Sequence, residues 1–196
     1  GDDTILGDHG RVTYNLAGGF IRAESLYPTD GGDDVIDAGN GVNLVIAGQA
    51  NDTVTTGDGF DIIIGDSGEA NFDNAGVLTD MRTIAHDQGG DDTIAAGAGG
   101  NVVFGGQGAD SITSSTVFGG RDILVGDNAE VILTNNIVTR FESTDVGDVT
   151  GGNDTILGSD ADTYALGGTG MDTITTGEGD DTILGDHGRV TYNLAG

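Results

Sequence analysis

The chain has 196 residues, of which 38 are glycine and one is proline, and it contains neither cysteine nor tryptophan. Its 33 acidic and 6 basic side chains give a formal net charge of −27. Nucleic acids and anionic membranes select basic patches, and no apolar run is long enough to cross a bilayer, so neither nucleic-acid binding nor membrane insertion is expected. So many carboxylates repel one another in a compact state unless cations bind. The composition therefore excludes an ordinary helical domain and leaves a disordered chain or a cation-dependent fold.

The chain repeats itself over a long period. Residues 1–18 recur unchanged as residues 179–196, which indicates a piece of a longer tandem array. Within this period, the phrase Gly-Gly-(Asp/Asn)-Asp-(Val/Thr)-Ile begins at residues 31, 89 and 151. We therefore expect one continuous solenoid over residues 1–196, with units of about 31–88, 89–150 and 151–196, and with residues 1–30 as the end of a preceding unit.

A shorter period lies inside each unit. Residues 105–113 (GGQGADSIT) and 167–175 (GGTGMDTIT) both read Gly-Gly-x-Gly-x-Asp-x-aliphatic-x, and consecutive nine-residue frames of this kind make up most of each unit. The eighth position of the first four frames is always aliphatic, which predicts a strand residue that points into the core. These predicted core residues are Ile36, Val45, Val54, Ile63, Ile94, Val103, Ile112, Leu124, Ile156, Ala165, Ile174 and Ile183.

The residues beside each core position point to the opposite face of the strand. In alternate frames they are short and polar, as at Thr53 and Thr55, so the first predicted sheet should meet water on this face. In the other frames they are apolar, as at Leu44 and Ile46, so the second predicted sheet should be covered.

The longer segments that close each unit are the candidate covers. Segments 14–28, 74–86 and 134–148 mix polar and apolar residues, and each holds one arginine: Arg22, Arg82 and Arg140. We expect these segments to fold back over the second sheet, with each arginine meeting a carboxylate. Lateral association with another chain is the alternative cover, and plain surface charge is the alternative interpretation of the arginines.

The turns between strands have the composition of calcium sites. Glycines let the backbone adopt left-handed conformations and direct carbonyl oxygens to one point, and a carboxylate at the sixth frame position completes an oxygen-only site. Calcium takes six to eight oxygens, so two stacked turns should share each ion, with aspartates 18 residues apart in register. What we call the first turn ladder comprises Asp34, Asp52, Asp92, Asp110, Asp154 and Asp172, with Gly105, Gly106, Gly108, Gly167, Gly168 and Gly170 in its turns.

The other turns form a weaker series, which we call the second turn ladder: Asn43, Asp61, Asn101, Asp122, Thr163 and Asp181, with Asp3 as a further candidate ligand. One member of each pair is uncharged, so these sites should be weaker or empty. Where each longer segment begins, the second frame position is aspartate, and we hypothesise that Asp8, Asp66, Asp127 and Asp186 replace the missing carboxylate from the other side of the turn. The alternative for all these residues is a tight turn with solvated carboxylates.

These frames resemble the RTX, or haemolysin-type, calcium-binding nonapeptide repeats of bacterial secreted proteins. The phrases GDHG, GDSG and GDNA that open the longer segments are similar to a variant found in giant bacterial surface proteins. The resemblance implies an all-β fold, a right-handed parallel β-roll or β-helix with strands in two sheets and several calcium ions in the turns. It also implies secretion, by a type I pathway, to the extracellular space or the bacterial cell surface.

The resemblance further implies one of two functions. The first is that of a calcium-dependent structural or extender repeat of a large secreted surface protein or adhesin, which folds on calcium binding outside the cell. The alternative is a polysaccharide-binding module that accompanies an extracellular carbohydrate-active enzyme. Such a module should show a line of exposed aromatic residues, and Tyr27, Phe141 and Tyr164 form no evident line in the sequence.

No enzyme is expected. The Gly-Asp-Ser-Gly phrase at residues 65–68 places its serine at a position that varies between repeats. His9, His86 and His187 lack the spacing of a zinc site and are expected to be exposed turn residues. The Gly-x-Gly-x-x-Gly fragments lack a following helix, so they predict no dinucleotide site.

Overall fold

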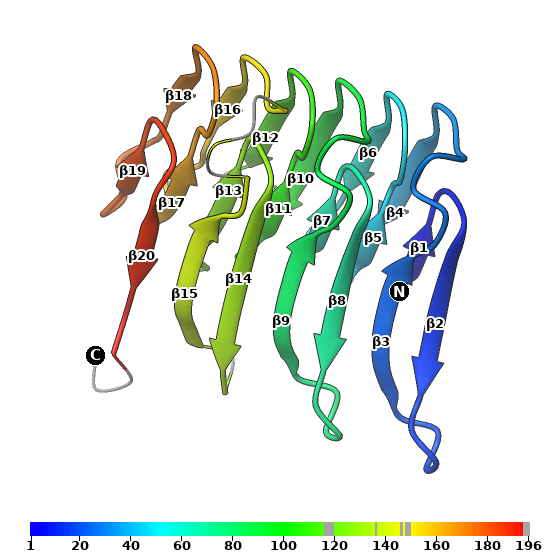
Figure 1. The fold of residues 1–196 in the computed structure, drawn as a ribbon. Coiled ribbons are helices and arrows are strands. Elements are labelled where there is room, and N and C mark those ends of the chain that lie inside the picture. Colours follow the sequence, from blue (N-terminus) through cyan, green and yellow to red (C-terminus); the bar gives the residue numbers. More distant parts are fainter. Residues whose placement is uncertain (116–119, 136, 146, 148–149, 194–196) are drawn as a thin grey trace.

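The computed structural model describes residues 1–115, 120–135, 137–145, 147 and 150–193, which form three β-sheets (Figure 1). The middle sheet is parallel, and its strands in spatial order are β1 (Thr4–Leu6), β5 (Leu44–Ile46), β7 (Ile62–Ile64), β11 (Val102–Phe104), β13 (Asp122–Val125), β17 (Thr163–Leu166) and β19 (Thr182–Leu184). The outer sheet is also parallel, with β4 (Val35–Gly39), β6 (Thr53–Thr56), β10 (Thr93–Ala98), β12 (Ser111–Ser115), β16 (Thr155–Leu157) and β18 (Thr173–Thr175). None of the described residues belongs to a helix that could span a membrane.

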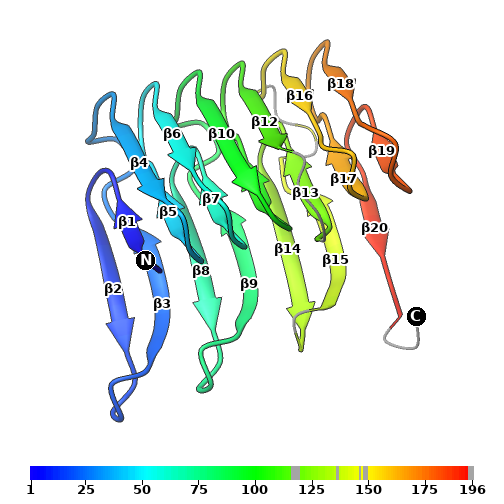
Figure 2. The ribbon, with the colours of Figure 1, turned by 180° about the vertical axis from the view of Figure 1, so that it is seen from behind.

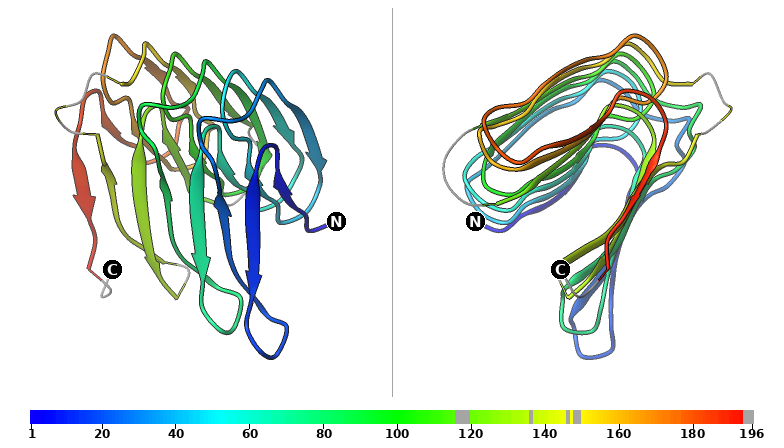
Figure 3. Two further views of the ribbon diagram at one scale, coloured as in Figure 1. Left: turned by 45° about the vertical axis from the view of Figure 1, so that its right-hand side comes forward. Right: turned by 90° about the vertical axis from the view of Figure 1, so that its left-hand side faces the viewer.

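The chain alternates between the middle and outer sheets, and each coil pairs with the next in parallel register. Ile36 lies beside Val54 in the outer sheet, and Val45 lies beside Ile63 in the middle sheet. The view along the stack shows the coils superimposed (Figure 3). The expectation of an all-β solenoid with parallel sheets is therefore confirmed.

The eighth frame positions fill the space between these two sheets, as predicted. Ten of the twelve belong to one buried cluster and Ile174 packs against it, whereas Ile183, on the edge strand β19, is 49% exposed. The opposite face of the outer sheet carries exposed residues such as Thr53, Thr55 and Thr173, also as predicted. Figure 2 views the molecule from the side of the outer sheet.

The prediction of only two sheets is wrong, because the longer segments build a third. This hairpin sheet is antiparallel and has the order β2 (Gly10–Tyr14), β3 (Phe20–Ser25), β8 (Gly68–Phe72), β9 (Leu78–Thr83), β14 (Ala129–Thr134), β15 (Ile137–Ser143) and β20 (Arg189–Thr191). Each hairpin begins well before the predicted cover segment, because the chain turns into β8 or β14 directly after leaving the middle sheet. Hairpins of neighbouring units also pair, as β9 does with β14.

The hairpin sheet covers the second predicted sheet, as expected. Ala70, Met81 and Val131 on its inner face pack with Leu44, Ile46 and the other apolar residues of the middle sheet in one buried cluster. The chain's own segments therefore bury this apolar face.

Charge pairing fills the outer face of the hairpin sheet. Arg22 contacts Glu24 at 2.6 Å and also contacts Glu69, which Arg82 meets at 2.5 Å. In the next hairpin, Arg140 contacts Glu142 at 3.2 Å and also contacts Glu130. The prediction that each of these arginines meets a carboxylate is confirmed, and because the glutamates are largely buried beneath them, these pairs are more than exposed surface charge.

Candidate metal centre

The first turn ladder is a continuous row along one edge of the solenoid, where the chain passes from the middle to the outer sheet. The backbone N–H of Asp34 donates to Oδ1 of Asp52 at 2.7 Å, and the N–H of Asp52 donates to Oδ1 of Asp92 at 2.8 Å. The same bond links each following pair through Asp110, Asp154 and Asp172. The sequence predicted only the pairs 18 residues apart; the row also crosses the hairpins, between residues 40 and 44 positions apart.

Each aspartate in this row keeps its second oxygen unused. Oδ2 of Asp34, Asp52, Asp92, Asp110, Asp154 and Asp172 is inaccessible to solvent and accepts no hydrogen bond. Asp92 and Asp110 are 1% and 2% exposed. A buried carboxylate is costly unless its charge is compensated. Six such oxygens in one row fit a site in which a bound cation takes these oxygens as ligands and compensates their charge.

Glycines keep these oxygens open to the neighbouring coil. A Cβ added to Gly105 would lie less than 3.0 Å from both Asp110 Oδ2 and the carbonyl oxygen of Gly126, and Gly167 is placed in the same way beside Asp172 Oδ2 and the Gly185 carbonyl. The carboxylate of one coil and a carbonyl of the next therefore share one space, as a calcium ion bound between coils requires.

The fourth frame position also requires glycine. Gly108 has φ +122°, and a Cβ there would lie less than 3.0 Å from the carbonyl oxygen of Gly90 in the preceding coil. Within the described residues, no group of three or more acidic, histidine or cysteine side chains could hold a metal. A site here would therefore depend on backbone carbonyls for most of its oxygens.

Burial and mutual repulsion raise the pKa values of this row. Loss of solvation raises the pKa of Asp110 to about 10, and the charges of Asp92 and Asp154 add to the shift. Burial likewise raises the pKa of Asp92 to about 8, of Asp154 to about 8 and of Asp52 to about 7. Without a cation, the folded chain thus holds protons on carboxylates that are ionised in water at neutral pH.

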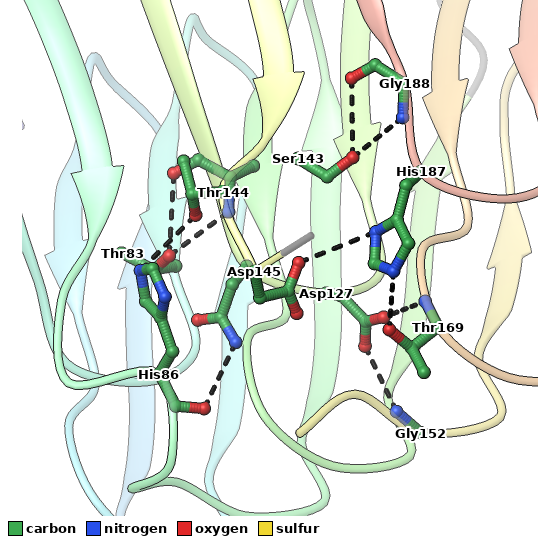
Figure 4. A network of polar contacts seen from close by, with 12 residues as sticks. Thr83, His86, Asp127, Ser143, Thr144, Asp145, Gly152, Thr169, His187 and Gly188 are labelled. Atoms are coloured by element: carbon green, nitrogen blue, oxygen red, sulfur yellow. Dashed lines mark hydrogen bonds and ion pairs between the residues drawn. The ribbon is translucent and has the colours of Figure 1, made fainter. Parts of the chain in front are cut away.

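Asp8, Asp66 and Asp127, which we call the exit aspartates, lie beside the first turn ladder where each hairpin leaves the middle sheet. Asp127 accepts the N–H of Gly152 at 3.1 Å on one oxygen and the N–H of Thr169 on the other (Figure 4). Asp8 and Asp66 make the equivalent pairs of bonds. Each exit aspartate thus links the segment that follows its hairpin to the next coil. Their hypothesised role as substitute metal ligands stays a prediction.

The second turn ladder follows the opposite edge with the same kind of register. The N–H groups of Asn43 and Asp61 donate to Oδ1 of Asp61 and Asn101, at 3.0 and 3.1 Å. Asn101 N–H donates to Asp122 Oδ1, and Thr163 N–H to Asp181 Oδ1, both at 2.9 Å. Between Asp122 and Thr163 the series breaks, because the Asp122 N–H donates to a backbone carbonyl. Asp3, whose N–H reaches Asn43 Oδ1 at 3.2 Å, and Asp186 are exposed.

Sequence reasoning missed one pair of residues beside the first turn ladder. The Asp145 carboxylate is fully buried without a hydrogen bond, and its Oδ1 lies 3.7 Å from Nδ1 of His187, whose Nε2 contacts Thr169 Oγ1 at 2.9 Å (Figure 4). His9 is exposed as expected, but the His187 side chain is only 26% exposed. Asp145 lies outside the nonapeptide frames, so the repeat gave no signal for it.

Comparison with known families agrees with this geometry. The RTX calcium-binding nonapeptide repeat matches four stretches of the chain, residues 29–54, 46–69, 86–115 and 165–189. The chain carries RTX calcium-binding repeats. All of the first turn ladder except Asp154 lies within the matched residues. RTX repeats bind calcium, so calcium is the cation that fits the unused oxygens of this row. No curated protein and no solved structure matches the chain.

Proposed function

We propose that this chain is a calcium-dependent structural segment of a large secreted bacterial surface protein or adhesin, and that it folds when it binds calcium outside the cell. The observation that carries the proposal is the row of six buried Asp Oδ2 atoms without hydrogen bonds. The role is structural rather than catalytic, because the repeat uses its acidic residues to build turns. RTX repeats are typical of secreted bacterial proteins, which supports the extracellular location.

The metal acts on folding through the charge of the chain. Bound calcium supplies the positive charge that the buried carboxylates lack. The aspartate Oδ2 atoms and the glycine carbonyls of adjacent coils would hold the ion, and a bound ion would thereby link two coils. Because the unfolded chain has no formed site, the binding free energy adds directly to the free energy of folding. Low calcium inside the cell would then keep the chain unfolded before export, and higher calcium outside the cell would let it fold afterwards.

The repeated ends set the dimensions of an array. Strand β19 has the same sequence as β1 and lies six strand positions further along the middle sheet. At about 4.8 Å per position, one 178-residue period advances the solenoid by about 29 Å. This is short for so many residues, so an extender of this kind gives stiffness along its axis and needs many periods to give reach.

The polysaccharide-binding alternative finds less support. Phe141, Tyr164 and Tyr192 stack in a row, with ring centroids 5.3 and 5.1 Å apart, whereas the Tyr27 ring contacts His9 instead, so the three predicted aromatics form no common line. Phe141 and Tyr164 are nevertheless 1% and 5% exposed, and they belong to the core between the middle and hairpin sheets. Buried rings cannot act as a platform for sugars.

The proposal is tested by far-ultraviolet circular dichroism during a calcium titration that starts in excess chelator, with magnesium as the control. A coil-to-strand transition with calcium alone is expected, because magnesium prefers a smaller, octahedral and largely hydrated shell. Full strand content in excess chelator would refute the folding switch.

A further inference from the structure

We infer that calcium binds along only one edge of the solenoid, the first turn ladder, and that side chains of the chain itself close the second turn ladder in place of a cation. This inference rests on the proposed function and specifies where its metal binds. Three differences between the two edges carry it.

The first difference is the presence of amide donors. Nδ2 of Asn43 donates to the Gly39 carbonyl at 3.0 Å and to Oδ1 of Asp61 at 2.9 Å. Nδ2 of Asn101 donates to the Gly97 carbonyl at 3.0 Å. These amides hold the glycine carbonyls that a cation would need. In the first turn ladder the corresponding residues are all aspartates, which can only accept such bonds when ionised.

Hydroxyl groups act similarly further along the second edge. Oδ2 of Asp122 accepts the Ser159 hydroxyl at 3.0 Å, and the Thr163 hydroxyl donates to the Ala161 carbonyl at 3.2 Å. The hydrogen bonds that Asp122 accepts from the Asn101 N–H and the Ser159 hydroxyl also oppose the rise in its pKa that burial causes. Asp122 therefore has partners on both oxygens, unlike every aspartate of the first turn ladder.

The second difference is at the residue that lies two positions after each core residue, where the chain enters the turn. On the first edge this residue is Gly7, Gly65, Gly105, Gly126 or Gly167, and a Cβ there would lie less than 3.0 Å from the ladder carboxylate; Ala47 is the exception. On the second edge it is Ala38, Thr56, Ala96 and Ser114, which are 8%, 5%, 3% and 5% exposed, with Gly158 as the exception. Their buried side chains occupy the space that glycine leaves open on the other edge.

The third difference is the density of charge. Every coil of the first turn ladder contributes a carboxylate, so each gap between coils has one on both sides. In the second turn ladder Asn43, Asn101 and Thr163 separate the aspartates, so each gap from Asn43 onward has a carboxylate on one side only. Calcium affinity depends on the number of charged ligands. Asp61 is the decisive residue, because its Oδ2 is the one buried second-ladder carboxylate oxygen without a hydrogen bond among the described residues.

The test compares two matched substitutions, Asp92→Asn and Asp61→Asn. Both aspartates are at most 1% exposed, and Oδ1 of each accepts one backbone N–H from the adjacent coil. The number of bound calcium ions and their affinity are measured by isothermal titration calorimetry, and circular dichroism in saturating calcium checks that each variant folds. We expect Asp92→Asn to lose at least one ion or to weaken binding by about tenfold or more, and Asp61→Asn to leave both the number and the affinity within about twofold.

An equal loss in the two variants would overturn the inference. If Asp61→Asn does not fold, Asp122→Asn provides the same comparison in the same ladder. As a gain-of-site variant, the double substitution Ala96→Gly with Asn101→Asp should add calcium binding at the second edge. A wild-type chain that binds no calcium would instead refute the proposed function, so the two failures are distinguishable.

Discussion

Replacing Asp110 with asparagine should change stability in opposite directions with and without calcium. The folded, metal-free chain raises the pKa of this residue from 3.8 to about 10. At about pH 7 the folded state must therefore hold a proton that the unfolded state releases, at about 1.4 kcal/mol per pH unit above 3.8, or about 4 kcal/mol in all. Asparagine removes this cost and keeps the oxygen that accepts the Asp92 N–H at 2.7 Å.

In calcium the same substitution should remove a proposed charged ligand from the gaps on both sides of the coil. If each of the two sites weakens about tenfold, the unfolding free energy falls by about 3 kcal/mol. We therefore expect Asp110→Asn to be more stable than the wild type in excess chelator, by up to about 4 kcal/mol, and less stable in millimolar calcium.

Urea unfolding followed by circular dichroism measures both effects. Glu178→Gln, an exposed substitution that also removes one negative charge, is the control and should change stability little in either condition. If the metal-free chain is too unstable for a urea transition, its strand content in chelator reports the same sign. An Asp110→Asn variant that is destabilised equally in both conditions would refute the reasoning, because the carboxylate would then act only as a hydrogen-bond acceptor.

Three further predictions concern the first turn ladder and the exit aspartates. In chelator, the unfolding free energy should fall as pH rises from about 4 to about 8, because the folded-state pKa values of Asp52, Asp92 and Asp154 are raised to between about 7 and about 8. In calcium the unfolding free energy should rise over the same range. Urea midpoints measured across pH would show whether the two slopes differ in sign. Gly105→Ala should weaken calcium binding by about tenfold or more, because the added Cβ would contact Asp110 Oδ2. Ala47→Gly, at the equivalent frame position, should strengthen calcium binding. Calorimetry that found no change in either variant would argue that these positions do not need glycine. Asp127→Ala should lower the unfolding free energy in calcium by about 2 to 5 kcal/mol, because two backbone N–H groups lose their acceptor. Asp127→Asn should recover part of the lost stability. A thermal melt of Asp127→Ala that is indistinguishable from the wild type would contradict a stabilising role for these two hydrogen bonds.

Local sequence was sufficient for the parts of this fold that repeat locally. The nine-residue period placed Ile36, Val54 and their equivalents in the core, because a strand side chain either points inward or does not and the pattern recurs in every coil. Sixth-position aspartates 18 residues apart came into register for the same reason. The contrast between Thr53 and Leu44 on the opposite strand faces also predicted which sheet would be covered.

Contacts between distant segments needed the tertiary structure. The longer segments carried no nonapeptide signal, and their strands pair both within a hairpin and between hairpins more than 40 residues apart in sequence, as β9 does with β14. That pairing joins the hairpins into a third sheet, and it brings Asp145 beside His187 across 42 positions.

The sequence by itself determined the coil, its core and the residue types of a calcium site, since these depend on neighbours one or two frames away. Only the tertiary structure decided that the first turn ladder runs unbroken past the hairpins. The N–H of Asp52 donates to Asp92 because β8 and β9, which separate the two residues in sequence, lie outside the stack of coils. It also showed which oxygens remain unused, since whether Oδ2 of an aspartate or Nδ2 of an asparagine has a partner depends on the carbonyls and hydroxyls of the next coil.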